Sequence, residues 1–433
     1  MDVLIGLSMI LCFCFLAALG LAIPFAFLLP CLTGLVLFWG GLDALGIAAR
    51  SAITTTDSFI MLALPLFMMM GELISRSGIA GDAFDTLELW LKRIPGGLVI
   101  SSILGCAICG ACTGSSIATT LTMANATLPK LVPRGYNKSL LAGVLGGSSI
   151  GMIIPPSSGF IIYGRLSDAS IAKLFMAGLT AGIIMTLIFM VYIVIRVALN
   201  PSLAPALAED VTWRRRLVAL KYFWPFPVII GGVLGSMYGG VATPVEASAL
   251  GVVAVTLVSY LRGTLTMKLL KETFLATARN ASWLLLILFV GMTFGHLVVK
   301  LGVSSTLESL LVTAGVPPWM VIAGMLLLVI IMGCFIDGAS IMILTVPIFM
   351  PIIDALGYDP IWFGLQIMIT IEIGLITPPM GISCYVLAGV MQPYGITLEQ
   401  VFRANFVYVL LMSLSIAIFF VFPDLVMWLP NRM

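Results

Sequence analysis

Long apolar runs separated by short polar stretches make up most of the chain. A membrane-crossing helix needs about 20 consecutive apolar residues, whereas a strand of a membrane barrel alternates apolar and polar residues. The runs here are long and do not alternate, so the pattern predicts an all-α polytopic membrane protein. The predicted spans lie at residues 2–19, 22–40, 58–77, 174–195, 222–237, 240–260, 282–301 and 404–427.

Polar or amphipathic segments separate several of these spans. Residues 41–57 contain Arg50 and Asp57 and are too polar to cross a bilayer. Residues 82–94 carry apolar side chains on one stripe, which is typical of a helix lying at the membrane interface. Residues 264–281 form a second amphipathic piece, which is basic.

Four further apolar segments are interrupted in their middle by Gly, Ser, Thr or Pro. Residues 98–128 form either one long span or two short arms with a polar tip. The pairs Pro155-Pro156 and Pro378-Pro379 break two helices, because each proline lacks an N–H and frees the carbonyl that it would have bonded. The interrupted segments are 98–128, 139–164, 319–353 and 361–389.

Motifs of the first half recur in the second half in the same order. The heptapeptide that begins at Ile150 matches the one at Ile373, 223 residues later. Three other matches have offsets within one residue of this value: Gly71 with Gly295, Gly114-Ser-Ser with Gly338-Ala-Ser, and Leu128-Pro with Met350-Pro. The pattern indicates an internal duplication. We expect repeat 1 over residues 1–200, a polar central loop over 201–221, and repeat 2 over 222–433.

Basic residues change sides between the repeats. The loops 76–97 and 130–138 hold six Lys or Arg residues, whereas their counterparts in repeat 2 hold only Lys300. The loop 41–57 has one basic residue, whereas its counterpart 262–281 has four. Because short cytoplasmic loops are enriched in Lys and Arg, the repeats are expected to have inverted topology. The basic loops face the cytoplasm only if 98–128 is a re-entrant hairpin, and the same holds for 319–353. Both termini then lie outside.

Composition excludes several classes of protein. Of the 433 residues, 61% are hydrophobic and 9% are charged. Soluble domains have about 45–50% apolar and about 25% charged residues, so this composition excludes a soluble enzyme, a disordered chain, a coiled coil and a nucleic-acid binder. Cys106, Cys109 and Cys112 have cluster-like spacing, but the bacterial iron–sulfur run needs a fourth Cys followed by Pro. We interpret them as small packing residues and expect no transition-metal site.

The hairpin tips and helix breaks carry the candidate chemistry. Unwound backbone persists in a membrane only where it lines a cavity or is buried in protein. Freed carbonyls beside Ser and Thr hydroxyls suit a small hard cation, and the N-terminal ends of half-helices suit a carboxylate. The paired arrangement therefore predicts a cation and anion site at the midplane. The alternative is ordinary kinks whose hydroxyls bond the preceding turn.

Few charged residues lie within the apolar segments. We interpret Asp337 as a sodium ligand, with a cap of the hairpin tip as the alternative. Glu246 is expected to favour the start of a helix through the helix dipole. Glu72 and Glu372 are expected at span ends or paired with basic residues. His296 is more readily interpreted as an interfacial structural residue than as a proton relay.

These motifs resemble one known family along nearly the whole chain. The chain resembles the large membrane subunit of tripartite ATP-independent periplasmic (TRAP) transporters, dicarboxylate-transporter M type. Cys112 stands where the family often has Ser, and Val245 where it often has Thr. The resemblance is carried by Ala63-Leu-Pro-Leu-Phe67, Gly110-Ala-Cys-Thr-Gly-Ser-Ser116, Gly147 to Ser157, Ala242-Thr-Pro-Val-Glu-Ala247, Gly333-Cys-Phe-Ile-Asp-Gly338 and Gly374 to Gly381.

The resemblance implies an elevator-type ion-transporter fold. Two hairpins and two broken helices would move against a scaffold that includes residues 1–77 and 222–301. The resemblance implies that sodium drives uptake of an organic acid across the bacterial inner membrane, with both termini periplasmic. It also implies a small four-helix membrane subunit and a periplasmic substrate-binding protein as partners, and no cofactor besides sodium. The scaffold arms would be 44–57, 82–94, 264–281 and 304–315.

The resemblance also implies roles for individual residues. The implied substrate-binding residues are Ser157, Ser158 and Gly381. The implied sodium-binding residues are Thr113, Gly114, Ser115, Ser116 and Pro155 in repeat 1, and Asp337, Gly338, Ser340, Thr377 and Pro378 in repeat 2.

Other functions remain as alternatives. The chain carries neither H-E-x-x-H nor a serine elbow to pair with its single histidine, so we do not expect an enzyme. It carries no phosphate-binding G-x-x-x-x-G-K-[ST] loop, although the permease of an ATP-driven importer would not need one. A proton-coupled carboxylate transporter and a channel are further alternatives. The substrate is open among C4-dicarboxylates, sialic acid, keto acids and sugar acids.

Overall fold

The computed structural model describes most of the chain, and every regular element in the described part is a helix. Most of the first predicted span, 2–19, and nearly all of the predicted arm 304–315 lie outside the described residues. The described residues are 8–9, 11–13, 15–16, 19–38, 41–92, 94, 96–205, 212–303, 306 and 315–433.

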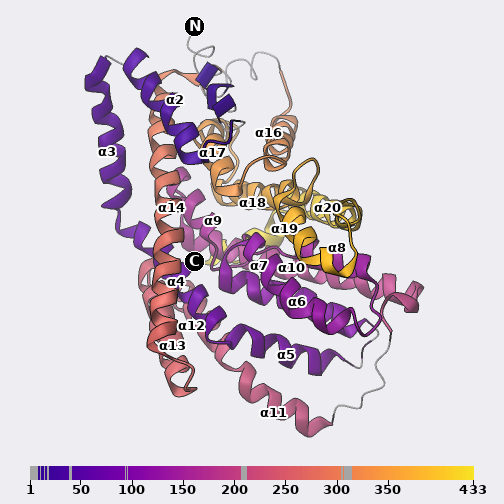
Figure 1. Ribbon diagram of the computed structural model, residues 1–433. Helices are drawn as coiled ribbons and strands as arrows, with labels where there is room; N and C mark the ends of the chain where they lie inside the picture. Colours follow the sequence, from indigo (N-terminus) through magenta and orange to yellow (C-terminus); the bar gives the residue numbers. More distant parts are fainter. Residues whose placement is uncertain are drawn as a thin grey trace.

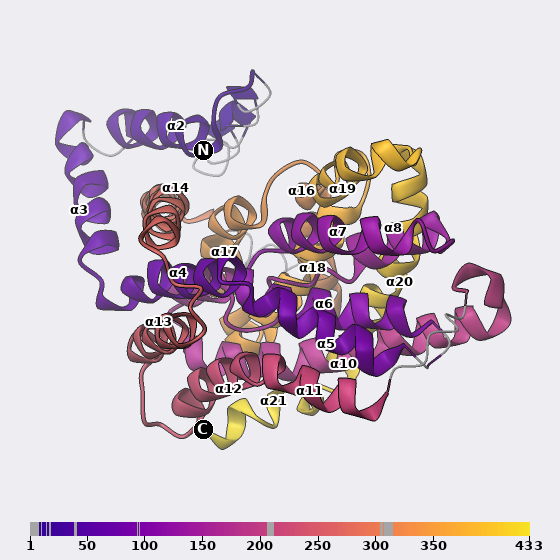
Figure 2. The same cartoon turned by 60° about the horizontal axis from the view of Figure 1, so that its bottom comes forward.

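One group of helices covers the described part of the segments that we predicted as scaffold. In Figures 1 and 2, α3 and α13 lie on the same side of the molecule as α14, which packs against α3 and also against α17 (Gly338–Ala355). The helix α4 packs against both α13 and α14 and also touches the first hairpin. The group consists of α2 (Ile23–Phe38), α3 (Leu45–Thr56), α4 (Ala63–Arg76), α12 (Pro225–Tyr238), α13 (Pro244–Leu261) and α14 (Met267–Lys300).

The long helix α14 corrects one predicted boundary. We expected an amphipathic arm at 264–281 followed by a separate span at 282–301. The structure instead has a single helix of 34 residues. Its sequence contains no proline, and its first glycine is Gly291. The change from amphipathic to apolar composition reflects different surroundings of the two parts of the helix. It does not end the helix, because no helix-breaking residue stands at the change.

Residues 98–128 form a helical hairpin and not one long span, and a second hairpin lies in the other half of the chain. The first hairpin joins α6 (Gly97–Thr113) to α7 (Ser116–Leu131), and the second joins α16 (Pro318–Gly333) to α17 (Gly338–Ala355). At the first tip, Gly114 has a φ of +59°, which ends α6 in a conformation that favours glycine. The segment is therefore two arms rather than one span.

Two broken helices follow the hairpins. The first consists of α8 (Lys138–Gly147) and α9 (Ser158–Ser167), and the second of α18 (Pro360–Ile376) and α19 (Ile382–Met391). Each break contains a Pro-Pro pair joined by a cis peptide bond. The predicted breaks are confirmed, because proline has no N–H to donate and disfavours helical geometry in the residue before it.

Matching glycines join each hairpin to its broken helix. A Cβ on Gly110 would lie 2.8 Å from the Cα of Gly151, and a Cβ on Gly333 would lie 2.8 Å from the Cα of Gly374. The two contacts are 223 residues apart in sequence, like the Pro-Pro motifs. Small residues allow such close backbone approach between membrane helices. The two halves therefore have corresponding elements and contacts, while their inverted orientation stays a prediction.

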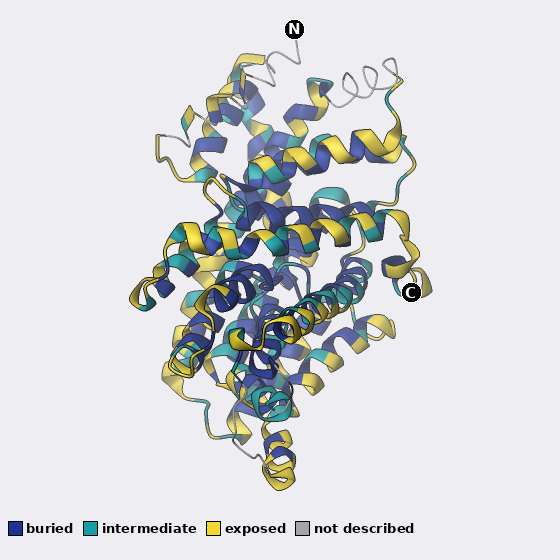
Figure 3. Cartoon of the chain, turned by 90° about the vertical axis from the view of Figure 1, so that its right-hand side faces the viewer, coloured by how far each residue is buried: buried dark blue, intermediate teal, exposed yellow. Residues whose placement is uncertain are grey.

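The remaining helices flank this core. In the described part of the chain, six helices are long and apolar enough to cross a membrane. Figure 3 shows buried residues in the interior and exposed residues along the outer faces of the helices. Many of the exposed side chains are large and apolar, which suits contact with lipid. The flanking helices are α5 (Ile79–Leu91), α10 (Ile171–Leu199), α11 (Trp213–Phe223), α20 (Leu398–Val421) and α21 (Asp424–Met427).

The basic loops gather on one side of the molecule, which we call the basic side. Loop 130–138 reaches α5 through Lys130 and Arg134, and loop 262–281 reaches the same region through Arg262. The helix α11 packs on α5, where Thr86 donates to the carbonyl of Ala219 at 3.1 Å. These are the segments that charge assigns to one face of the membrane. Their assignment to the cytoplasm stays a prediction.

Candidate functional site

Hydroxyl groups gather around one carbonyl at the first hairpin tip. Thr113 Oγ1 lies 3.1 Å from the carbonyl oxygen of Ser115 and 2.9 Å from Thr119 Oγ1. Thr119 Oγ1 donates to the same carbonyl at 2.8 Å. The side chain of Ser115 caps α7 by accepting from the N–H of Ala118. The tip therefore offers hydroxyl and carbonyl oxygens in a small volume.

The first tip lies directly on the first helix break. Ser158 Oγ donates to the carbonyl of Gly114 at 3.0 Å. A Cβ on Gly151 would lie 2.8 Å from the carbonyl carbon of Ser115, so the break approaches the tip closely only because residue 151 is glycine. The structure thus brings together the predicted residues of the first tip and the first break, including Pro155 in the same loop.

Glu372 joins this region from the other repeat. It lies on α18 and is 2% exposed. Its Oε1 accepts from the N–H of Met152 at 3.1 Å and from the hydroxyl of Ser116. Among the described residues, no ion pair includes Glu372. A buried carboxylate of the second repeat therefore closes the break of the first.

The sequence did not predict this role for Glu372. We expected both glutamates at span ends or paired with a basic residue. Glu72 is paired, because its carboxylate lies 2.8 Å from Arg76 Nε, whereas Glu372 lies four residues before the end of α18 and has no ion pair among the described residues. A signal was present, because Glu372 stands inside an apolar run five residues before the Thr377-Pro378 break. A carboxylate in such a segment is costly and marks a functional site by default.

The second tip is organised by Asp337. Its Oδ2 accepts from the N–H groups of Ala339 at 3.1 Å and Ser340 at 3.2 Å, and its Oδ1 accepts from the Ser340 hydroxyl at 2.6 Å. This is the capping role that we weighed as the alternative for Asp337. A sodium contact for Asp337 stays a prediction, as it does for Gly338 and Ser340.

The second break differs from the first in its contacts. Thr377 Oγ1 donates to the carbonyl of Ile373 at 2.6 Å, which is the ordinary bond of a hydroxyl to the preceding turn. A Cβ on Gly338 would lie 2.7 Å from the side chain of Ile371 and 3.0 Å from that of Met152. The second tip therefore converges with the first break at Met152 and lies beside α18 one to two turns before Pro378.

The predicted substrate residues are engaged within the protein. Ser157 is fully buried and donates to the carbonyl of Met152 at 2.6 Å, while Ser158 holds the first tip. Gly381 begins α19 with a φ of +47°, and a Cβ there would lie 2.7 Å from the ring of Phe402. These contacts fix the starts of α9 and α19 at the two breaks.

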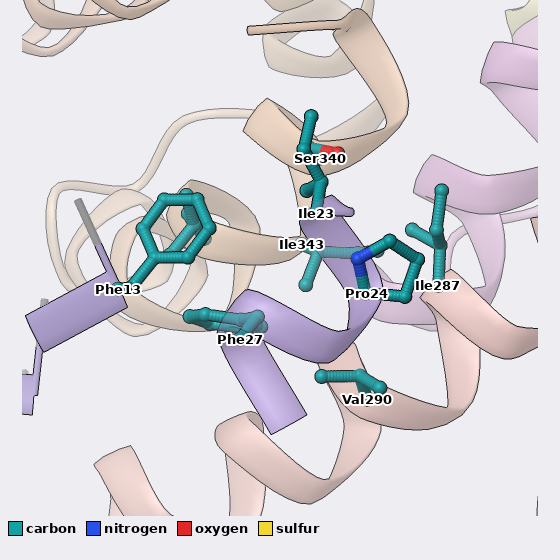
Figure 4. Close-up of a pocket in the computed structure, with 9 residues that line it drawn as sticks. Phe13, Ile23, Pro24, Phe27, Ile287, Val290, Ser340 and Ile343 are labelled. Atoms are coloured by element: carbon teal, nitrogen blue, oxygen red, sulfur yellow. The ribbon is translucent and has the colours of Figure 1, made fainter. Parts of the chain in front are cut away.

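A small apolar cavity lies where α2, α14 and α17 meet (Figure 4). Its volume is about 10 Å³, and its lining includes Phe13, Phe27 and Ile343, with Ser340 as the polar member. A single water needs roughly 10–15 Å³ and several polar partners. This cavity is therefore too small and too apolar for an organic acid.

Other predicted roles can be compared with the structure. His296 Nδ1 lies 3.2 Å from Ser51 Oγ, which joins α14 to α3 and fits a structural histidine. Glu246 accepts from the N–H of Thr243 at 2.8 Å and completes a capping box at the start of α13, as expected. The cysteines at 106, 109 and 112 are buried and free.

The chain is similar to known transporter subunits over nearly its whole length. The family model described as the tripartite ATP-independent periplasmic transporter, DctM component, matches residues 10–425. The chain is 29% identical over 394 residues to the C4-dicarboxylate TRAP transporter large permease protein DctM of Pseudomonas aeruginosa, covering 90% of each. It is 27% identical over 425 residues to the ectoine TRAP transporter large permease protein TeaC of Halomonas elongata, covering 94% of this chain and 96% of that one. The isethionate TRAP transporter permease protein DctMQ of Oleidesulfovibrio alaskensis is 28% identical over 350 residues, which cover 79% of this chain and 54% of that one.

Solved structures of transporters share the fold. The YdaH transporter of Alcanivorax borkumensis matches with a TM-score of 0.66 and 13% identity, covering 90% of each chain. MtrF of Neisseria gonorrhoeae matches with a TM-score of 0.60 and 13% identity, covering 89% of this chain and 85% of that one. At such low identity this likeness concerns the fold alone. The match over residues 10–425, together with the apolar helices, shows that the chain is a multi-pass membrane protein and belongs to the DctM component family of tripartite ATP-independent periplasmic transporters.

Proposed function

We propose that the chain is the transport subunit of a sodium-coupled symporter that imports an organic acid. The relatives are named for a C4-dicarboxylate, for ectoine and for isethionate, and each of these compounds carries a carboxylate or a sulfonate. The proposed substrate is therefore a small organic compound with a carboxylate or sulfonate group, with C4-dicarboxylates and sialic acid among the candidates.

The donor set at the first tip fits sodium. Hydroxyl and carbonyl oxygens gather at Thr113 and Ser115, and these are ligands that a small hard cation prefers. Glu372 places a buried carboxyl group beside Ser116, and among the described residues no cationic side chain pairs with it. A buried carboxylate without a counter-charge favours a nearby cation. Bound sodium would supply that positive charge.

The predicted ion and substrate residues divide between the two repeats. The sodium ligands of repeat 1 are Thr113, Gly114, Ser115, Ser116 and Pro155, and those of repeat 2 are Asp337, Gly338, Ser340, Thr377 and Pro378. The first N–H groups of a helix have no carbonyl partner within it, and such groups at the starts of α9 and α19 favour an anion. Ser157, Ser158 and Gly381 stand at these starts, where they would contact the substrate carboxylate.

The proposed movement is of the elevator type. The hairpins and broken helices share contacts with one another, and they meet the predicted scaffold where α14 packs against α17 and where α4 packs against α6 (Figure 2). A small four-helix membrane subunit would brace the scaffold, and a periplasmic binding protein would deliver the substrate. The name of the DctMQ relative agrees with a large and a small permease part in one chain. We place the protein in the bacterial inner membrane with periplasmic termini.

One observation carries this proposal. Two helices are interrupted at matching Pro-Pro motifs, and the first interruption is held by groups from both repeats at Met152. Interrupted helices at a repeat interface are the usual site of substrate and coupling ion in secondary transporters.

Reconstitution tests the coupling. The chain, its small subunit and its binding protein are placed in liposomes, and uptake of labelled succinate is followed with an inward sodium gradient or with potassium in its place. Uptake is expected only with sodium and is expected to be insensitive to orthovanadate. Equal uptake without sodium would contradict the sodium coupling. Uptake that follows a pH gradient alone would favour a proton-coupled transporter, and inhibition by vanadate would favour an ATP-driven importer.

A further inference from the structure

A second cavity lies on the basic side, away from the hairpin tips. Its volume is about 180 Å³, and it opens between the start of α8, the end of α10 and the start of α20. Lys138 donates to the carbonyl of Tyr394 at 2.6 Å, and the N–H of Asn137 donates to the carbonyl of Leu203 at 3.0 Å, so both neighbouring loops meet here. None of the residues proposed for sodium or substrate lines this cavity.

Two arginines line the cavity. Arg196 on α10 bonds the hydroxyl of Tyr192 and stacks on that ring, with its guanidinium carbon 5.7 Å from the ring centroid. Among the described residues, no ion pair includes Arg196. Arg403 on α20 pairs with Glu399 at 3.1 Å, and both side chains are 82% exposed. An exposed pair of this kind is weak, so Arg403 can turn to another anion.

A buried hydroxyl in the lining has no partner. Tyr408 on α20 is 2% exposed and lines the cavity, yet no hydrogen bond reaches its hydroxyl in the described part of the chain. Buried hydroxyl groups are normally paired, because an unpaired one costs free energy. This observation is independent of the arginines and also indicates a polar occupant. Ser139 in the first turn of α8 also lines the cavity, while Asn137 caps this helix by accepting from the N–H of Leu140 at 3.0 Å.

Exposed apolar side chains lie on the same helices as the cavity lining. Val194 and Ile195 on α10 and Phe406 on α20 are exposed apolar side chains close to the cavity, which suits contact with lipid chains. The cavity itself lies at the helix ends, where the basic loops begin. Basic pockets between membrane helices on the cytoplasmic side are suited to anionic lipid headgroups.

We propose that this cavity is an anion-binding site that takes a phosphate or carboxylate group. Arg196 is its fixed cation and Arg403 its mobile one, while Tyr408 and Ser139 supply hydroxyl groups. The group comes either from the headgroup of an anionic phospholipid or from a soluble organic anion. The site is distinct from the proposed ion and substrate site, and it does not depend on sodium coupling.

Lipid and anion titrations distinguish the two sources. The purified protein is placed in phosphatidylcholine nanodiscs, and its thermal midpoint is measured as phosphatidylglycerol replaces part of the lipid. In a second arm, inorganic phosphate or succinate is added in phosphatidylcholine alone. If the thermal midpoint rises and saturates with phosphatidylglycerol, the site binds a lipid headgroup. If it rises and saturates with phosphate or succinate, the site binds a soluble anion.

Variants test the residues. Arg196→Gln and Arg403→Gln each remove one charged contact to the anion. Each is therefore expected to raise about tenfold the ligand concentration that gives half of the rise in thermal midpoint. Arg403 is exposed, so its variant retains the fold even if the Arg196 variant does not. Tyr408→Phe is expected to fold well and to respond less to the ligand. The matched control is Arg214→Gln, which removes an exposed charge from α11 and is expected to respond like the parent chain.

The proposal would be overturned by either of two results. The first is the absence of a saturable effect in both arms. The second is an effect that survives in the Arg403 and Tyr408 variants, because the anion would then bind elsewhere. Both readouts measure binding, so a failure here leaves the uptake experiment on sodium coupling unaffected.

Discussion

Replacing Glu372 with alanine is expected to loosen the break in the first broken helix, although residue 372 belongs to the second. The carboxylate accepts from the N–H of Met152 at 3.1 Å and from the hydroxyl of Ser116. Alanine removes this shared acceptor, Oε1, from the part-buried N–H of Met152 and from the buried hydroxyl of Ser116. The segment around Met152 then loses the contacts that hold it to α18.

The magnitude follows from these hydrogen bonds. With Glu372 ionised, each hydrogen bond to its carboxylate contributes about 1.5–3 kcal/mol, which gives roughly 3–6 kcal/mol for the pair. The N–H of Met152 also reaches the hydroxyl of Ser116 at 3.2 Å, so part of its pairing survives. We therefore expect the lower end, about 3 kcal/mol, which corresponds to roughly a hundredfold faster local opening.

Hydrogen exchange measures this opening directly. Peptides that cover residues 148–158 are followed by mass spectrometry in the parent chain and in the variants. Glu372→Ala is expected to raise the exchange rate of these peptides about a hundredfold. Glu372→Gln keeps one carbonyl oxygen as an acceptor and is expected to raise it only about tenfold.

A control is available on the same helix. Gln366 is fully buried on α18, and neither of its amide atoms has a hydrogen-bond partner in the described part of the chain. Gln366→Leu is therefore expected to leave exchange at residues 148–158 unchanged. Parent-like exchange in Glu372→Ala would refute the contact. Equal loosening by Gln366→Leu would show that any change in α18 has this effect.

Three further predictions concern other parts of the molecule. Asp337→Asn keeps the helix cap, because asparagine also accepts there, and is expected to weaken the sodium activation of uptake; unchanged sodium affinity would remove Asp337 from the ion site. Gly71→Ala places a Cβ on the carbonyl oxygen of Cys112 and is expected to abolish the monodisperse peak in size-exclusion chromatography, whereas Gly235→Ala on α12, with open space around it, is expected to keep that peak. His296→Ala removes one hydrogen bond and is expected to retain uptake; a folded but inactive variant would favour a proton relay.

Local patterns in the sequence predicted the interruptions of the helices. The Pro-Pro pairs end α18 and precede α9 for reasons that lie within a few residues, and the cap at Asp337 depends on its own first turn. The two-armed form of the hairpins followed from charge, because the basic loops had to share one side. The predicted boundary within α14 was wrong because a change of composition was interpreted as a change of structure.

Contacts between the repeats could not be predicted in this way. Glu372 bonds residues that are 256 and 220 positions away, and no periodicity within one helix carries that information. The cavity beside Tyr408 likewise needs three helices from both halves of the chain. Sequence patterns specify which backbone groups are left free, while their pairing across the fold depends on packing.

The ion pairs that α5 makes with the first hairpin have a consequence for conformational equilibrium. Lys130 Nζ lies 2.6 Å from Asp85, and Arg134 lies 3.0 Å from Glu88, so charges on α5 face charges at the end of α7. Any displacement of the hairpin relative to α5 separates both pairs. Each exposed pair contributes up to about 1 kcal/mol, and two together change the ratio of two states by at most roughly thirtyfold. Added salt screens such pairs, so ionic strength alone is expected to shift the resting population of states.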